Sequence, residues 1–287
     1  VIEYTAIQYG RFFLLFICSV SFFVFAFFHL GDVSSVMKEG IKEGMPLLAG
    51  VAGFLVESIR LAISIAGGLV AARCLVWAGL VDRRMLDDTY IDPVRDFFSR
   101  YGLKSAFLLL LLIGFYRVSD IVLGVISMVF YVDLGFNKTE IAAIVQTFGI
   151  IMTIVGGFLG GMLTVRYSVK KILMAGAILA SATNILFMIL ASVEPNIWML
   201  KAVIAADNLA AGMASAAFVA FLSGLTSISF TAMQYAIFSS LMTLFPKLLA
   251  GYSGTVVDSI GYSSFFMLTA LIGLPVIVLI WLVRKVE

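Results

Sequence analysis

Residues 106–132 read AFLLLLLIGFYRVSDIVLGVISMVFYV, and Arg117 and Asp120 are the only charged residues among them. About 20 mainly apolar residues are enough for a helix to cross the hydrocarbon core of a bilayer. The whole chain has the same character, since 62% of its 287 residues are apolar and only 13% are Asp, Glu, Lys or Arg. These are too few charges for the polar shell of a soluble domain. The composition therefore predicts a membrane protein, and no basic cluster is long enough to follow a nucleic-acid backbone.

Seven further apolar stretches accompany this one, and strands that alternate polar with apolar residues, as in a membrane barrel, are not favoured. The sequence thus predicts an all-α polytopic membrane protein. We expect its eight transmembrane helices at residues 12–30, 58–80, 106–132, 139–163, 172–193, 197–222, 232–257 and 262–283. Glu57, Arg60 and Arg73 interrupt the second stretch, and residues 36–56 are expected to form an amphipathic helix at the interface that leads into it.

The most polar stretch, residues 81–104, divides the chain into a two-span front at 1–80 and a six-span back at 105–287. Its charges alternate in sign, which is typical of a solvated connector, and a short surface helix is expected after Asp92-Pro93.

The Lys and Arg residues indicate which side of the membrane each loop faces. One set of loops and ends carries eleven of them, the opposite set four, and the spans themselves four. The eleven are Arg11, Arg83, Arg84, Arg95, Arg100, Lys104, Arg166, Lys170, Lys171, Arg284 and Lys285. Because cytoplasmic loops are rich in Lys and Arg, we expect the connector and both ends of this chain to be cytoplasmic.

Charged side chains at membrane depth are costly and therefore mark candidate functional sites. Arg117 and Asp120 are three residues apart and Tyr116 and Asp120 four apart, so we expect them at neighbouring positions of one helix. They form either an internal ion pair that fixes the helix in the bundle, or a pair lining a water-filled cavity. In the second case Asp120 binds and releases a proton while Arg117 holds an anionic group.

The later spans hold the other polar candidates. Asp207 and Asn208 precede a run of small residues in the sixth span, where Asp207 is either a substrate or proton site or a structural hydrogen-bond anchor. Gln146 precedes two small-residue pairs, Gly156 with Gly160 and Gly157 with Gly161, for which internal helix packing is favoured over dimerisation. The seventh span carries Gln234 and Tyr235 near its start. It also contains Pro246 and Lys247, where a proline kink is expected to form a hinge.

Enzyme chemistry is not indicated by any of these residues. The chain has no phosphate-binding G-x-x-x-x-G-K motif, and a single histidine, His29, cannot form a metalloprotease motif. Cys18 and Cys74 have no metal-type spacing and are expected to be inert thiols. We expect neither enzyme activity nor a metal or other cofactor.

The loop after the fourth span carries a family resemblance. Residues 161–171, GMLTVRYSVKK, resemble the short cytoplasmic loop G-x-L-A-D-R-x-G-R-K of the major facilitator superfamily. In that superfamily the loop joins the second and third helices of a six-helix half, which is its place in residues 105–287. The resemblance implies that 105–287 is the C-terminal half. It also implies a cytoplasmic gating loop that includes Gly161, Arg166, Lys170 and Lys171.

Other segments are similar to the AmpG-like muropeptide permeases of the peptide/acetyl-coenzyme A transporter family. They are Tyr116-Arg117 with Asp120, Asp207-Asn208 with the following Gly212-Met213, and Phe230-Thr231-Ala232 with Gln234-Tyr235. Members of this family have two extra helices between their halves, which would account for residues 1–80.

The family resemblance implies proton-coupled import of anhydro-muropeptides across the bacterial inner membrane for peptidoglycan recycling. It further implies that the site is completed by an N-terminal six-helix half in the same or another chain. The alternatives are a carrier of another solute, such as an acyl-coenzyme A or a peptide, and a non-transporting scaffold or receptor with this fold.

Overall fold

The computed structural model describes residues 4–44 and 49–283. Eight helices in these two ranges are long and apolar enough to cross a membrane, in agreement with the eight expected spans. Residues 45–48 of the expected amphipathic segment and the cations Arg284 and Lys285 lie outside the described residues. The chain divides into two compact units, residues 1–93 and 94–287, which are described one at a time.

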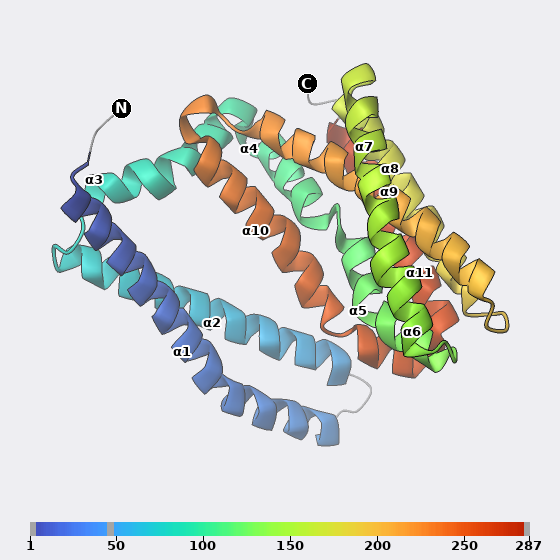
Figure 1. Cartoon of the computed structure of the whole chain (residues 1–287). Coiled ribbons are helices and arrows are strands. Elements are labelled where there is room, and N and C mark those ends of the chain that lie inside the picture. The colour runs from blue at the N-terminus through green and yellow to red at the C-terminus, as the bar shows by residue number, and fades with distance from the viewer. Residues whose placement is uncertain (1–3, 45–48, 284–287) are drawn as a thin grey trace. The chain divides into compact units, whose positions relative to one another are not determined.

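The first unit is a helical hairpin followed by short helical turns (Figure 1). Its elements are α1 (Ala6–Gly44), α2 (Ala49–Trp77), α3 (Arg83–Leu86) and the π-helix η2 (Asp87–Ile91). The hydroxyl of Tyr4 donates to Asp88 Oδ2 at 2.6 Å and so ties the start of α1 to η2. This hydrogen bond raises the pKa of Tyr4 to about 12.

Two of the three charges that interrupt the second span, Glu57 and Arg60, join α1 to α2. Glu57 accepts from Lys38 Nζ at 2.6 Å and pairs with Arg60 at 3.1 Å. Arg60 also donates two hydrogen bonds, at 2.8 and 2.6 Å, to the carbonyl oxygen of Phe27. Polar side chains within a helix pair therefore find partners inside the hairpin, as burial in hydrocarbon requires.

The second unit contains the six-span back of the chain (Figure 1). Its elements are α4 (Asp92–Phe115), α5 (Val118–Asp133), α6 (Lys138–Ile141), the π-helix η3 (Ala142–Phe148), α7 (Gly149–Arg166), α8 (Val169–Leu190), α9 (Ile197–Leu225), the 3₁₀ helix η4 (Ile228–Phe230), α10 (Thr231–Ala250) and α11 (Ser253–Val283). In this unit α9 packs along α7 and α8, while α11 packs along α8 and α5, and α10 along α5.

Several helix ends follow directly from local sequence. Asn137 begins α6 with a capping box, since its side chain accepts from the Glu140 amide at 2.9 Å and its own amide donates to Glu140 at 3.0 Å. Asn196 caps α9 by accepting from the amides of Trp198 and Met199. The helix expected after Asp92-Pro93 is present as the first part of α4, which Gly102 interrupts with a positive φ of 71°.

Four details of the expected spans were wrong. Residues 36–44 continue α1 and residues 49–56 already belong to α2, so no separate interfacial helix occurs in the described part of 36–56. The third span is two helices, because Tyr116 and Arg117 form a turn between α4 and α5. The seventh span ends at Ala250 and not at 257, because residues 253–260 already open α11, which Gly261 then bends with φ 77°. Pro246 accordingly lies in the last turns of α10 and not in mid-span, and a hinge at Pro246 and Lys247 stays a prediction.

Two glycines on one face of α7 allow its close approach to α9. A Cβ atom on Gly156 would lie 2.3 Å from the carbonyl oxygen of Leu209, and one on Gly160 would lie 2.6 Å from that of Met213. Gly157 and Gly161 of the second pair have nothing within 4 Å of such an atom. The expectation of internal packing is thus confirmed for Gly156 and Gly160.

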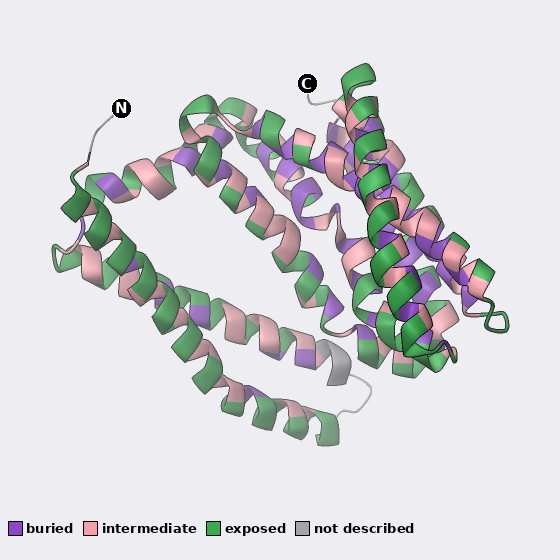
Figure 2. Cartoon of the chain, in the orientation of Figure 1, coloured by how far each residue is buried: buried purple, intermediate pink, exposed green. Residues whose placement is uncertain are grey.

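The described helices leave many large apolar side chains uncovered, as expected for a protein in lipid. Figure 2 shows exposed residues along α7, where Phe158 is 72% and Met162 69% exposed. The core of the second unit is aromatic, and it contains the fully buried rings of Phe130, Phe187 and Phe266.

Candidate functional site

The turn between α4 and α5 positions the two charges of the third span. Arg117 is the residue before α5, with φ −98° and ψ 8°, and Asp120 lies in the first turn of that helix. A carboxylate is favourable in the first turn, where the unpaired amides of a helix carry partial positive charge. The break at Tyr116 and Arg117 thus produces a local field that suits Asp120, which a continuous helix would not.

Arg117 connects this turn to α9. Its Nε lies 3.1 Å from Asp120 Oδ2, so the expected ion pair is confirmed, and the two side chains are 24% and 16% exposed. Its Nη1 donates to Ser215 Oγ, and that hydroxyl donates in turn to the carbonyl oxygen of Ala211 at 2.6 Å. The Nε proton makes no hydrogen bond within the described part of the chain. The pair is therefore held by charge, with the Nε atom of Arg117 buried against Asp120.

Asp207 of α9 adds a second carboxylate. Its Oδ1 accepts from Thr183 Oγ1 of α8 at 3.1 Å. Asp207 lies within range of direct Coulomb interaction with both Asp120 and Arg117. We call Arg117, Asp120 and Asp207 the Arg117 cluster. With all three groups ionised it has two negative charges and one positive, and among the described residues no Lys or Arg forms an ion pair with Asp207.

Asn208 faces a different neighbour from Asp207. Its Oδ1 accepts from Thr153 Oγ1 of α7 at 2.8 Å, and its Nδ2 donates to the carbonyl oxygen of Ile204 in its own helix. The two adjacent side chains thus connect α9 to α8 and to α7. Asn208 has the contacts of a packing anchor, whereas Asp207 has a single hydrogen bond to a hydroxyl and a nearby cation.

Tyr116 lies within Coulomb range of Asp120 and Arg117, but its hydrogen bond and ring contact are made to other residues. Its ring stacks on Phe218 with centroids 4.4 Å apart, and its hydroxyl donates to the carbonyl oxygen of Leu173 at 3.1 Å. The side chain is almost fully buried in the core. The expectation that Tyr116, Arg117 and Asp120 share neighbouring positions of one helix was wrong for Tyr116, because the turn after Phe115 sends it toward α8 and α9.

Gln234 and its neighbour Tyr235 lie elsewhere in the second unit. Gln234 Nε2 donates to Asp96 Oδ2 at 2.9 Å, and its Oε1 accepts from Arg100 Nη2 at 3.0 Å and from the Ser227 amide at 2.8 Å. This network joins the start of α4 to the start of α10 and shares no residue with the Arg117 cluster. Tyr235 packs against the apolar core. A role for either residue in the same pathway stays a prediction.

The remaining candidates are dispersed. Gln146 is exposed on the π-helix η3, a form that frequently marks functional sites. Arg166 ends α7, and Lys170 and Lys171 lie in the first turn of α8, so the basic residues of the predicted gating loop do come together. Lys247 is exposed beside the buried Pro246.

Sequence reasoning missed the hydroxyl and amide partners of these residues. Ser215 and Thr183 hold the cluster, and Thr153 holds Asn208. A buried pair, Asn184 Nδ2 donating to Ser119 Oγ at 2.7 Å, joins α8 to α5. Polar residues on small-residue helix faces were the available signal, since such groups bond across helices in membranes. Within the described ranges no three His, Cys, Asp or Glu side chains are grouped as a metal site would need.

Eight apolar helices of spanning length, with a charged cluster between packed helices, define a multi-pass membrane protein. Residues 106–287 match the family model described as Major Facilitator Superfamily. The chain belongs to this superfamily.

Two relatives illustrate where in the family it lies. The chain is 35% identical over 200 residues to "Putative transporter AmpG 4" of Rickettsia conorii, an alignment that covers 69% of this chain and 48% of the relative. It is 30% identical over 203 residues to "Anhydromuropeptide permease" of Escherichia coli, with 70% of this chain and 41% of the relative covered. The chain thus spans less than half the length of these relatives.

Proposed function

We propose that residues 105–287 form the C-terminal half of a secondary active transporter that imports anhydro-muropeptides into the bacterial cytoplasm in symport with protons. The observation that carries the proposal is the Arg117 cluster, in which one guanidinium faces two carboxylates within a six-helix unit of this superfamily. The printed name of the Escherichia coli relative supports the substrate class. A carrier is favoured over an enzyme by the family match and by the printed name of the Escherichia coli relative.

The cluster can couple proton uptake to anion binding if Arg117 exchanges its carboxylate partner for an anionic group of the substrate. With Asp120 ionised, Arg117 is neutralised by the carboxylate 3.1 Å away. When either Asp120 or Asp207 takes up a proton, the guanidinium of Arg117 gains attraction for another anion. The acidic groups of a muropeptide are anions of this kind. Proton uptake and substrate binding thus favour one another, as symport requires.

The rest of the machinery is proposed from the superfamily. A substrate site between two halves needs an N-terminal six-helix half, in the same or another chain, to supply its second wall. The protein is expected in the inner membrane with both ends of this chain cytoplasmic. Residues 161–171 are then a cytoplasmic gating loop, and α1 and α2 are helices inserted between the halves.

Uptake by right-side-out vesicles that contain this chain together with the N-terminal half tests the proposal. We expect concentrative uptake of labelled anhydro-muropeptide only with an inward proton gradient, and its loss in Asp120→Asn or Asp207→Asn. Asn208→Ser serves as the matched control, because that side chain contacts α7 and not the cluster. Equal uptake with and without the gradient would refute proton coupling. Uptake of an acyl-coenzyme A or a free peptide in place of the muropeptide would refute the substrate.

A further inference from the structure

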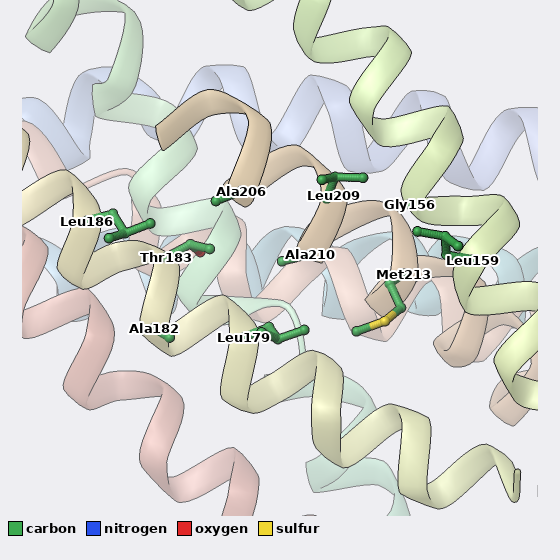
Figure 3. Close-up of a pocket in the computed structure, with 10 residues that line it drawn as sticks. All are labelled: Gly156, Leu159, Leu179, Ala182, Thr183, Leu186, Ala206, Leu209, Ala210 and Met213. Atoms are coloured by element: carbon green, nitrogen blue, oxygen red, sulfur yellow. The ribbon is translucent and has the colours of Figure 1, made fainter. Parts of the chain in front are cut away.

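An apolar groove runs between α7, α8 and α9 of the second unit (Figure 3). It encloses about 370 Å³, and among its walls are Leu159 on α7, Leu179 and Leu186 on α8, and Leu209 and Met213 on α9. Thr183 is the only polar residue among those that line it, and its hydroxyl is already bonded to Asp207 and to the carbonyl oxygen of Ala180. The groove therefore offers no polar partner to a solute and suits an apolar chain.

The groove is accessible from the outside of the six-helix unit. Leu159 and Leu179 on its opposite walls are 47% and 41% exposed, although each contributes to its lining. Exposed apolar residues continue along α7 past the groove, with Met162 at 69% and Val165 at 90%. An apolar track thus leads from the groove along α7 toward the loop that joins α7 to α8.

That loop is basic and lies at the end of both helices that flank the groove. Arg166 and Lys171 are both exposed, and Lys170 lies between them at the start of α8. The Ser168 side chain makes no capping hydrogen bond to α8 within the described residues. The first turn of this 22-residue helix therefore adds its partial positive charge to that of the side chains. Tyr167, next to Arg166, is an amphipathic ring of the kind found at headgroup level.

We propose that the loop and the groove together bind one anionic phospholipid, with its phosphate at Arg166 and Lys171 and an acyl chain in the groove. The spacing agrees with this assignment. Leu159 lies seven residues before Arg166, and Leu179 eight residues after Lys171, which at 1.5 Å per residue is about 10–12 Å along either helix. The acyl chains of one leaflet span about 15 Å, half of the hydrocarbon core. A chain that starts at the loop thus reaches the groove.

Charge complementarity selects the headgroup. Two exposed cations and a helix N-terminus attract a net negative headgroup, and basic sites of this kind at helix ends are known binding sites for anionic lipids. A zwitterionic lipid would fill the groove equally well but gain little at the loop. Neither the loop nor the groove contains a residue of the Arg117 cluster, so lipid binding by the purified chain can be measured without a transport assay.

Native mass spectrometry of the purified 287-residue chain in mild detergent tests the headgroup part. We expect dioleoyl phosphatidylglycerol to bind more tightly than dioleoyl phosphatidylcholine. In Arg166→Gln/Lys171→Gln, phosphatidylglycerol binding should weaken roughly thirtyfold, since one basic side chain near an anionic lipid contributes roughly fivefold. Phosphatidylcholine binding should not change. Arg83→Gln/Arg84→Gln removes two exposed cations from the other unit and is the matched control.

Neighbouring residues on α8 test the groove part. Leu179→Trp fills the groove and should reduce phosphatidylglycerol binding at least tenfold, whereas Ile178→Trp, 48% exposed but outside the lining, should leave it unchanged. Leu159→Trp fills the groove from the opposite wall, and circular dichroism checks that each variant is folded. Both Leu179→Trp and Leu159→Trp must weaken phosphatidylglycerol binding for the proposal to stand.

Four results would overturn the proposal. Equal binding of the two lipids, or no effect of the double charge variant, would show that no headgroup site exists. If the double charge variant weakens lipid binding but the groove-filling variants do not, the lipid is held by surface charge alone. Displacement of the lipid by millimolar inorganic phosphate would assign the loop to a soluble anion. A dimer in light scattering that Leu179→Trp dissociates, without lipid retention, would assign the groove to a second copy of the chain.

Discussion

Replacing Gly156 by alanine is expected to destabilise the six-helix unit, whereas the same change at the adjacent Gly157 is not. A Cβ atom at Gly156 would lie 2.3 Å from the carbonyl oxygen of Leu209, while ordinary contact begins at 3.4 Å. The shortfall is about 1.1 Å. The atom that the new methyl group would contact belongs to the backbone of α9 and not to the end of a flexible side chain. The helices α7 and α9 must therefore move apart to make room. At Gly157 nothing lies within 4 Å of the new methyl group.

Two opposing effects set the difference in free energy of unfolding between Gly156→Ala and Gly157→Ala. Overpacking of a well-packed interior costs about 1–3 kcal/mol. Replacing glycine by alanine inside a helix contributes about 0.5–1 kcal/mol of stability when the methyl group has room. Gly157→Ala receives only the second effect, whereas Gly156→Ala receives both. The free energies of unfolding of the two variants should therefore differ by about 1–3 kcal/mol, with Gly156→Ala the less stable.

Unfolding in mixed micelles, followed by circular dichroism as sodium dodecyl sulfate is increased, measures this difference. Gly160→Ala should behave like Gly156→Ala, because its Cβ would lie 2.6 Å from the Met213 carbonyl oxygen. Gly161→Ala should behave like Gly157→Ala. If all four variants unfold at the same detergent fraction, α7 does not pack on α9 through these glycines and the described interface is wrong.

Three further predictions concern charge, backbone and topology. If Asp120 is a proton site, Asp120→Asn should keep normal abundance on an immunoblot and lose concentrative uptake in the vesicle assay, which is the outcome we expect. If Arg117 and Asp120 form only a sealed structural pair, Asp120→Asn should lower abundance, and Arg117→Gln/Asp120→Asn should restore it. Gly261→Ala should cost about 1–3 kcal/mol of stability in the same micelle assay, because φ 77° and ψ 166° are adopted almost only by glycine, and Gly254→Ala, which has open space, should not. The topology is tested with single cysteines in a background without Cys18 and Cys74. An impermeant thiol reagent added from the periplasm should label cysteines at positions 38, 137 and 196. It should not label cysteines at positions 92 and 168.

The spans could be predicted from the sequence because the bilayer imposes one length and one polarity on all of them. The break within the third span could not. The turn at Tyr116 and Arg117 lies in a run without proline that is long enough for a continuous span, and the structure shows Tyr116 packed against α8 and α9 there. The end of α10 at Ala250 did have a signal in the sequence, since residues 251–260 read GYSGTVVDSI and contain two glycines, two serines and an aspartate.

The candidate site was predictable only where it is local in sequence. The ion pair of Arg117 with Asp120 follows from a three-residue spacing, which brings two side chains together wherever the helix lies. The contacts of Arg117 with Ser215 and of Asp207 with Thr183 join residues on different helices. Such contacts depend on the rotation of each helix about its axis, which small-residue faces indicate but do not fix. Gln234 was grouped with the cluster because sequence gives a polar residue in a span but not its depth.

Thr183 lies between the apolar groove and the Arg117 cluster and contacts both. Thr183 is among the residues that line the groove, and its hydroxyl holds Asp207 of the Arg117 cluster. The wall between the groove and the cluster is therefore one side chain thick at this point. A substituent that fills the groove from Leu179 or Leu159 leaves the hydroxyl in place, so loss of lipid binding in those variants does not by itself disturb Asp207. Conversely, Asp207→Asn keeps an acceptor for Thr183 and leaves the groove unchanged. Lipid binding and proton-coupled uptake are thus separate measurements. Because Arg166 and Lys171 also belong to the proposed gating loop, the groove variants at Leu159 and Leu179 are the ones that distinguish the two proposals.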